Sequence, residues 1–89
     1  MNDPRPRLAL GLLETRASRE AADAMAKAAR VRVVRYEVTR DALVTIVVRG
    51  DLAEVEAAVA AGQAAAQAVG TLWRGHVIPA PDPALEFML

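Results

Sequence analysis

The stretch LVTIVVRGD, from Leu43 to Asp51, constrains the fold more than any other part of the chain. Its first six residues form an almost unbroken row of β-branched and aliphatic side chains, which predicts a strand with much of both faces covered. Arg49 and Gly50 end this row. Asp51, with Glu54 three residues later, forms a capping-box pattern that predicts the start of a helix. A buried strand that leads directly into a helix therefore lies at the centre of the expected fold.

Further strands and helices are expected around this central strand. The patterns predict strands over residues 7–14, 31–38, 43–48 and 71–79, and helices over residues 20–30 and 52–69. The resulting order, β-α-β-β-α-β, predicts one α+β domain: a four-stranded sheet with two helices on one face, in the ferredoxin-like split βαβ arrangement. We expect residues 1–6 to be a flexible lead-in, residues 7–83 to form the domain, and residues 84–89 to form a short C-terminal helical tail.

Several local features of the strands are predicted as well. Gly11 lies inside the first apolar strand, which suggests that another element approaches the backbone closely there. The alternation of apolar and polar residues slips between Val33 and Val34, and a β-bulge would explain the slip. The four-residue connection 39–42 predicts a tight hairpin without glycine. Asp41 is the residue in it that best tolerates a left-handed backbone conformation.

The two predicted helices differ in how they pack. The first is rich in alanine and carries only one large apolar residue, Met25, so it must lie close to its support; Asp23 and Lys27 have the favourable acid-before-base spacing of four. Gly70 is well placed to end the second helix, and Gly62 inside it suggests close packing. The second helix carries one apolar stripe: Leu52, Val55, Val59, Gly62, Ala66 and Val69.

Size and composition indicate an oligomer. A chain of 89 residues has room for one domain. Hydrophobic residues make up 54% of it, yet aromatic residues make up only 3%, and much of the apolar share is alanine. A domain of this size buries only a modest core. Alanine lets helices lie close to whatever they pack against, which can include other subunits, so we expect the chain to form an oligomer.

Charge and cysteine content exclude several classes of function. Eleven basic and eleven acidic side chains give a formal net charge of zero, so there is no global electrostatic reason to bind nucleic acid or an anionic membrane. The chain has no cysteine, which rules out a disulfide scaffold or a zinc-thiolate site. No apolar run approaches the length of a membrane span. We expect a soluble, cytoplasmic protein.

No residue pattern indicates catalysis, a cofactor or a metal. His76 is the only histidine, and a metal site needs several convergent ligands, so a structural role is favoured. Ser18 has no histidine nearby in sequence and is better read as a helix-start residue than as a nucleophile. A catalytic carboxylate pair is not indicated, because no spacing singles one out among the acids Glu14, Glu20, Asp23, Glu37 and Asp41.

Short motifs occur along the chain in an order that is more specific than any one of them. They are LGLLET (10–15), AADAMAKAA (21–29), YE (36–37), LVTIVVRGD (43–51), AGQAAA (61–66), VG (69–70) and HVIPAP (76–81). Together they cover nearly the whole chain from Leu8 to Pro83. This succession resembles the bacterial microcompartment shell proteins, in the single-domain, hexamer-forming class that consists of one BMC domain.

The resemblance implies a structural protein with an antiparallel sheet, and not an enzyme. Its copies would form a flat ring of six that tiles with other shell proteins into the wall around encapsulated enzymes. Small metabolites would pass through a pore on the ring axis. By resemblance, the pore loop is Thr39, Arg40, Asp41 and Ala42. Lys27 and Ala80 correspond to the positions at the edge between rings.

Three departures from the family pattern are visible. The family pore loop is rich in glycine and serine, whereas this chain has Arg40, Asp41 and Ala42 there. Six copies around an axis would bring like charges together unless arginine and aspartate pair between neighbours. Ala80 replaces an arginine, which should weaken tiling. About three residues are missing between Thr15 and Glu20, and this shortening leaves a pentamer open. The alternative function is a ferredoxin-like regulatory oligomer that binds a small ligand between subunits.

Overall fold

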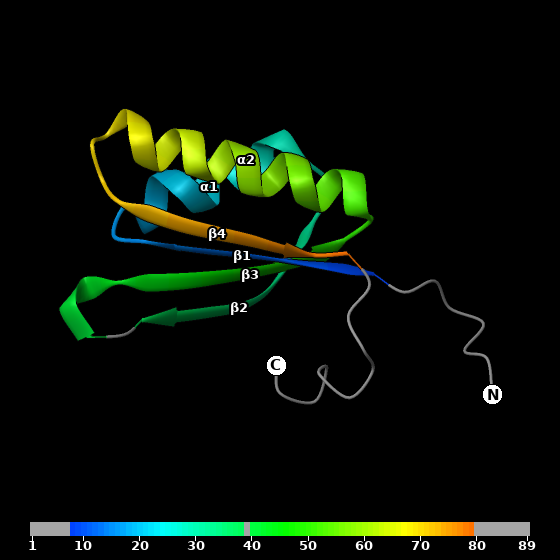
Figure 1. Ribbon diagram of the computed structural model, residues 1–89, viewed down its shortest axis with the longest axis horizontal. Coiled ribbons are helices and arrows are strands. Elements are labelled where there is room, and N and C mark those ends of the chain that lie inside the picture. Colours follow the sequence, from blue (N-terminus) through cyan, green and yellow to red (C-terminus); the bar gives the residue numbers. More distant parts are fainter. Residues whose placement is uncertain (1–7, 39, 80–89) are drawn as a thin grey trace.

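The computed structural model describes residues 8–38 and 40–79, and it has a four-stranded sheet covered on one face by two helices (Figure 1). The predicted lead-in and tail lie outside the described residues, as does Ala80. The order β-α-β-β-α-β and the α+β architecture are confirmed. The elements are β1 (Ala9–Thr15), α1 (Ser18–Ala28), β2 (Arg32–Val38), β3 (Val44–Gly50), α2 (Leu52–Ala68) and β4 (Trp73–Ile78).

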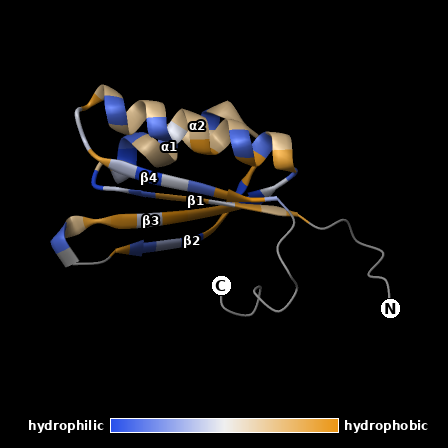
Figure 2. Cartoon of the chain, viewed as in Figure 1, coloured by the Kyte–Doolittle hydropathy of each residue, from blue (hydrophilic) through white to orange (hydrophobic). Residues whose placement is uncertain are grey.

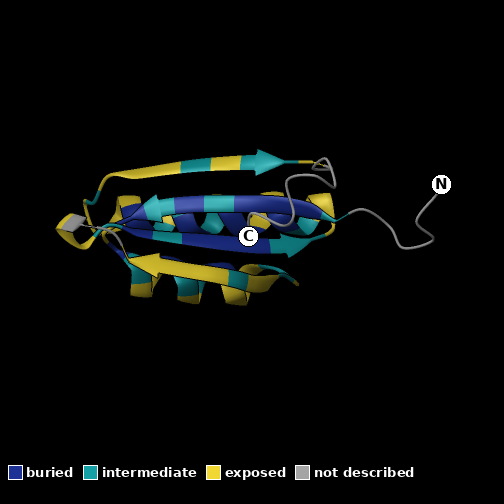
Figure 3. Ribbon diagram, turned by 90° about the horizontal axis from the view of Figure 1, so that it is seen from below, coloured by how far each residue is buried: buried dark blue, intermediate teal, exposed yellow. Residues whose placement is uncertain are grey.

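The predicted central strand does lie at the centre of the sheet. The strand order is β2-β3-β1-β4, and every neighbouring pair is antiparallel. Ile46 and Val48 of β3 are fully buried beneath the helices, and Val47, which points to the opposite face, is only 3% exposed. Seen from that opposite face, β1 and β3 are mostly buried while the edge strands β2 and β4 are exposed (Figure 3). The prediction that both faces of this strand are covered is therefore confirmed.

The core lies between the sheet and the two helices. Its largest fully buried apolar side chains come from four elements: Leu13, Met25, Ile46, Val48 and Val55. Alanine fills the remaining contacts, since Ala21, Ala58 and Ala66 are all at 0% exposure. Strand β3 is apolar over most of its length (Figure 2), and the exposed positions of α2 include several alanines as well as polar residues. Small side chains thus let the helices lie close to the sheet, as the alanine content predicts.

Gly11 is the point of closest approach between β1 and α2. A Cβ atom at this position would lie 2.7 Å from Val55 Cγ1 and 2.7 Å from Val59 Cγ2. Real Cβ atoms do not tolerate such distances, so only glycine fits without displacing the helix. The predicted close approach is confirmed.

The predicted end of α2 is also confirmed. Gly70 has a φ of 75°, the left-handed conformation that glycine adopts readily. The Gly70 amide donates to the Gln67 carbonyl at 3.0 Å, and the Thr71 amide donates to the Ala66 carbonyl at 3.0 Å. These two bonds form a Schellman motif, which satisfies carbonyls that the helix end would otherwise leave unpaired.

The predicted helix start after Asp51 is confirmed, but the hydrogen bonds of a capping box are not formed. Asp51 does occupy the N-cap position with an extended backbone, but its side chain makes no capping hydrogen bond. The Glu54 carboxylate is engaged elsewhere: its Oε1 atom accepts a hydrogen bond of 2.7 Å from the Arg30 amide. Glu54 therefore ties the connection between α1 and β2 to the start of α2 instead of closing the box.

Some predicted boundaries and packing positions differ from the structure. The first helix begins at Ser18, two residues earlier than expected, and Ala17 is its N-cap residue. Leu52 and Val69, the ends of the predicted apolar stripe, are 41% and 53% exposed because they lie at the two ends of α2. The predicted bulge in β2 is confirmed by a register shift between Val33 and Arg35.

Candidate functional site

The connection between β2 and β3 is a tight turn at one end of the sheet. It contains a short 3₁₀ helix, η1 (Arg40–Ala42), and the antiparallel pairing on either side confirms the predicted hairpin (Figure 1). Asp41 has a φ of 62°, as predicted, and Ala42 has a φ of 60°, which the sequence did not indicate. Each non-glycine residue in this conformation costs about 1–2 kcal/mol. Thr39 and the side chain of Arg40 lie outside the described part of the chain.

A side chain from another loop contacts this turn. The Arg16 Nε atom donates a hydrogen bond of 2.9 Å to the Asp41 main-chain carbonyl. Arg16 lies in the connection between β1 and α1, which consists only of Arg16 and Ala17. The bond leaves the Asp41 carboxylate exposed to solvent. The turn is therefore fixed by a partner 25 residues away in sequence.

Thr15 holds the base of the connection that carries Arg16. Thr15 is fully buried, and its hydroxyl donates to the Leu72 carbonyl at 3.1 Å. The same oxygen accepts a hydrogen bond of 3.1 Å from the Ala17 amide. One hydroxyl thus joins the β1–α1 connection to the α2–β4 connection, and both lie at the same end of the sheet as η1 because Thr15 pairs with Val44 and with Trp73.

Lys27 lies toward the opposite end of the domain. Helix α1 starts beside Thr15, at the η1 end, and its last turn leads to Arg32, which pairs with Arg49 at the far end of β3. The Lys27 Nζ atom is 3.0 Å from Asp23 Oδ2, so the predicted pair is formed on the helix surface, with the lysine side chain 77% exposed. Pro79 follows Ile78, which pairs with Leu10 at this same far end. The chain thus reaches position 80 from the end away from η1.

Both edges of the sheet expose large apolar side chains. On β2, Val33, Tyr36 and Val38 are 47%, 50% and 65% exposed. At the other edge, Trp73 of β4 is 41% exposed and Leu72 is 86% exposed. Apolar patches on two different edges suit the head-to-tail contacts that close a ring, in which one surface of a subunit meets a different surface of its neighbour.

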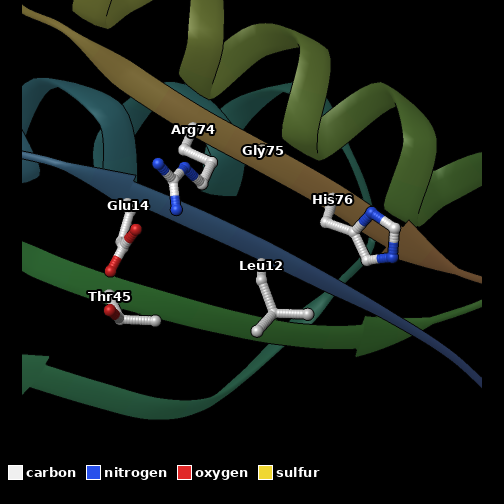
Figure 4. Close-up of a pocket in the computed structure, with 6 residues that line it drawn as sticks. All are labelled: Leu12, Glu14, Thr45, Arg74, Gly75 and His76. Atoms are coloured by element: carbon white, nitrogen blue, oxygen red, sulfur yellow. The ribbon is translucent and has the colours of Figure 1, made fainter.

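His76 lines a shallow groove on the sheet face away from the helices. The groove has a volume of about 220 Å³ and is bordered by Leu12, Glu14, Thr45, Arg74, Gly75 and His76 (Figure 4). Glu14 and Arg74 lie on neighbouring strands, whereas the His76 ring points along β4 away from them (Figure 4). Although four of these six residues are polar, most of the groove surface is formed by their carbon atoms. The polar groups do not converge on one point (Figure 4). This arrangement does not favour a ligand-binding site.

Ser18 has a structural position, and the acidic residues do not form a metal site in the described part of the chain. Ser18 is the first residue of α1, although no side chain caps the helix. Among residues 8–38 and 40–79, no three histidine, aspartate or glutamate side chains gather as metal ligands. Neither of the two described α-helices combines the length and the apolar character needed to cross a bilayer. Among the described residues, the η1 turn and the exposed edges of the sheet are therefore the best candidates for a functional site.

Residues 9–81 match the family model described as the BMC domain. The chain belongs to the BMC domain family. It is 50% identical over 84 residues to the bacterial microcompartment shell protein PduA of Citrobacter freundii, a match that covers 91% of this chain and 90% of that protein. It is 48% identical over 87 residues to the carboxysome shell protein CcmK2 of Thermosynechococcus vestitus, covering 92% of this chain and 85% of the relative.

The BMC domain assignment extends to structure. The solved structure of a microcompartment protein from Desulfitobacterium hafniense DCB has a TM-score of 0.77 and 30% sequence identity to this chain. The match covers 90% of this chain and 45% of that protein, so this BMC domain spans less than half of the solved chain. The family resemblance and the fold expected from the sequence are thus confirmed.

Two residues at the η1 end were not found from the sequence of this BMC domain. Arg16 and Thr15 contact the turn and its neighbouring connections, yet neither belongs to a recognisable motif for such a role. The only local signal was indirect: Arg16 directly follows the last residue of β1, so it lies at the end of the sheet where η1 also lies.

Proposed function

We propose that this chain is a structural shell subunit of a bacterial microcompartment in the cytoplasm. Its copies form closed hexameric rings that tile into a protein sheet, and a pore on the ring axis passes small metabolites. The observation that carries this proposal is identity of about half to named shell proteins over more than nine-tenths of the chain. These relatives are named as shell proteins and not as enzymes, which supports a structural role.

Exposed apolar side chains on both edges of the sheet support ring formation. Val38, beside the β2 edge, is 65% exposed and Leu72, beside the β4 edge, is 86% exposed, so both would lose contact with water if neighbouring subunits covered these edges. In the ring, the β2 edge of one subunit packs near the β4 edge of the next, and this contact removes both patches from water. Burial of such surfaces contributes about 25 cal/mol per Å².

The two ends of the domain have different roles in the proposed ring. The η1 turn, with residues 39–42, lies at the axis and lines the pore. Lys27 and Ala80 lie at the perimeter, where one ring meets another. The opposite placement of η1 and Lys27 along the sheet supports this division, since a pore residue and an edge residue must lie far apart in one subunit.

The proposed role implies three kinds of partner. Other shell proteins adjoin the ring at its edges, and encapsulated enzymes lie on one side of the sheet. Small polar metabolites cross at the axis, where Asp41 exposes a carboxylate.

Native mass spectrometry at micromolar concentration tests the ring directly. The expected result is a dominant species of six copies of the 9.5 kDa chain. Five copies would replace the hexamer with a pentamer. A dominant monomer or dimer would contradict the shell proposal, and a dimer would favour the alternative of a small regulatory oligomer.

A further inference from the structure

Arg16 is placed to control the shape of the η1 turn. Its Nε atom donates to the Asp41 carbonyl at 2.9 Å, and Asp41 is the first of two consecutive left-handed residues. We propose that Arg16 is a positioning residue that holds this turn in its left-handed conformation. Its effect on a pore rests on the proposed function, whereas the hydrogen bond itself lies within one chain.

The strain of the turn explains why an external contact is needed. Asp tolerates a left-handed backbone better than most residues do, but alanine has no side-chain hydrogen bond to offer in compensation. Two such residues in succession, Asp41 and Ala42, favour relaxation to an ordinary turn. A charge-assisted hydrogen bond to the carbonyl between them opposes that relaxation, because it stabilises the conformation in which it is formed.

Arg16 is a suitable anchor because its own backbone is fixed. Thr15 on one side is fully buried and bonded to Leu72, and Ala17 on the other side donates to the Thr15 hydroxyl. With both neighbours held, the arginine needs to order only its side chain to reach the turn. The guanidinium has five N–H donors, and the bond to Asp41 uses the one on Nε.

Two departures from the family pattern are thereby connected. The short β1–α1 connection leaves Arg16 at the end of the sheet, beside η1. The turn that it contacts is the one that lacks the expected glycine and has Ala42 at a φ of 60°. Arg16, in the two-residue β1–α1 connection, thus supplies a contact that supports the glycine-free turn.

Hydrogen–deuterium exchange tests the contact without reference to a ring. In Arg16→Gln, we expect exchange in the peptide spanning residues 38–44 to accelerate roughly two- to twelvefold, the factor that corresponds to the net contribution of one hydrogen bond. The rest of the sheet should exchange as before. The matched control is Arg19→Gln, which removes an exposed arginine of the same helix–loop region and should change nothing in the turn.

Unchanged exchange of the turn in Arg16→Gln would overturn the proposal. An acceleration spread evenly over the sheet would also overturn it, because it would assign Arg16 a general role in stability. If native mass spectrometry finds no rings, the exchange experiment is still readable, so failure of the proposed function and failure of this inference are distinguishable.

The role at the pore has its own measurement. In single rings placed in a planar membrane, Arg16→Gln should change the conductance while Arg19→Gln leaves it unchanged. Conductance of Arg16→Gln equal to that of the unmodified ring would overturn the positioning role at the pore, even if the turn exchanges faster.

Discussion

Gly62 of α2 lies directly against Met25 of α1. A Cβ atom added at position 62 would lie 2.8 Å from the Met25 Cγ atom and 2.9 Å from its Sδ atom. Met25 is 1% exposed and is among the largest fully buried side chains of the core. The Cδ2 atom of Leu13 in β1 would be closer still to the added atom, at 2.5 Å. The missing side chain at position 62 is therefore what allows both helices to share one shallow core.

We predict that Gly62→Ala destabilises the protein despite a better helix propensity. Alanine in place of a helix-interior glycine gains about 1 kcal/mol, whereas overpacking a filled core costs about 1–3 kcal/mol. The net loss should be about 1 kcal/mol, which lowers the melting temperature by about 4–8 °C in a domain of this size. Thermal unfolding at a fixed protein concentration measures it.

The control for Gly62→Ala is Ala60→Gly, at an exposed position of the same helix. It measures the propensity difference alone and should cost about 1 kcal/mol. If Gly62→Ala raises the melting temperature, the close contact with Met25 does not limit the helix spacing.

The sequence predicted those parts of the fold that depend on neighbouring residues. Gly11, Gly62 and Gly70 were each assigned correctly, because a glycine in a strand, inside a helix or after one has few explanations. The capping box failed because the Glu54 carboxylate bonds to the Arg30 amide, a partner 24 residues away. The spacing of residues along the sequence indicates which local hydrogen bonds can form, but it does not show whether a residue distant in sequence provides a better partner.

The candidate site was predicted in outline for the same reason. The tight turn and the left-handed Asp41 follow from local chemistry, whereas Ala42 at a φ of 60° does not, since alanine rarely adopts this conformation. The contact from Arg16 depends on where the β1–α1 connection lies in space. The family resemblance supplied the proposed role of the turn, and the structure supplied its neighbours.

Thr15→Val should be strongly destabilising because the hydroxyl serves two connections. Valine has nearly the same shape, but it would leave the Leu72 carbonyl and the Ala17 amide without this partner. Loss of a buried hydrogen-bonding group costs about 1–3 kcal/mol. Chemical denaturation measures the loss. The same substitution at Thr45, which is half-buried on the sheet face away from the helices, should cost much less than Thr15→Val; equal effects at both positions would contradict the role of the Thr15 hydroxyl.

Ala42→Gly should stabilise the protein. Glycine adopts a φ of 60° without steric cost, whereas alanine pays about 1–2 kcal/mol there; the greater freedom of glycine in the unfolded chain offsets part of the gain. We expect a net increase of about 0.5–1 kcal/mol in the free energy of unfolding. Thermal unfolding measures the change, with Ala60→Gly as the control. Because Ala60→Gly makes the same substitution inside a helix, it should lower the melting temperature, whereas Ala42→Gly should raise it. A lower melting temperature for Ala42→Gly would argue against a strained turn.

Asp41→Asn tests the charge of the proposed pore. Asparagine tolerates the left-handed conformation as aspartate does, so the substitution removes the carboxylate while keeping the turn. Each subunit then loses one exposed negative charge near the axis, and the ring should pass anions more readily relative to cations. The reversal potential of single rings under a salt gradient measures this preference. Glu56→Gln, at an exposed position on α2, should leave the reversal potential unchanged; a ring structure with Asp41 far from the axis would refute the pore assignment.

Lys27→Ala tests the proposed contact between rings. The ion pair with Asp23 joins two exposed side chains one helical turn apart, and such pairs contribute only about 0.3–0.5 kcal/mol. The subunit should therefore stay folded, and native mass spectrometry should still detect rings. Electron microscopy should find that extended sheets are lost, because the long, exposed lysine would no longer reach across the edge to the next ring.

Asp23→Ala separates the lysine from its ion pair. This variant breaks the same pair but keeps the Lys27 side chain, which remains available for the neighbouring ring. Sheets should therefore form with Asp23→Ala and fail with Lys27→Ala. Loss of sheets in both variants would mean that the intact pair, and not the lysine alone, makes the contact. Sheets in both would place the ring edge elsewhere on the domain, since the end away from η1 also carries the approach to Ala80.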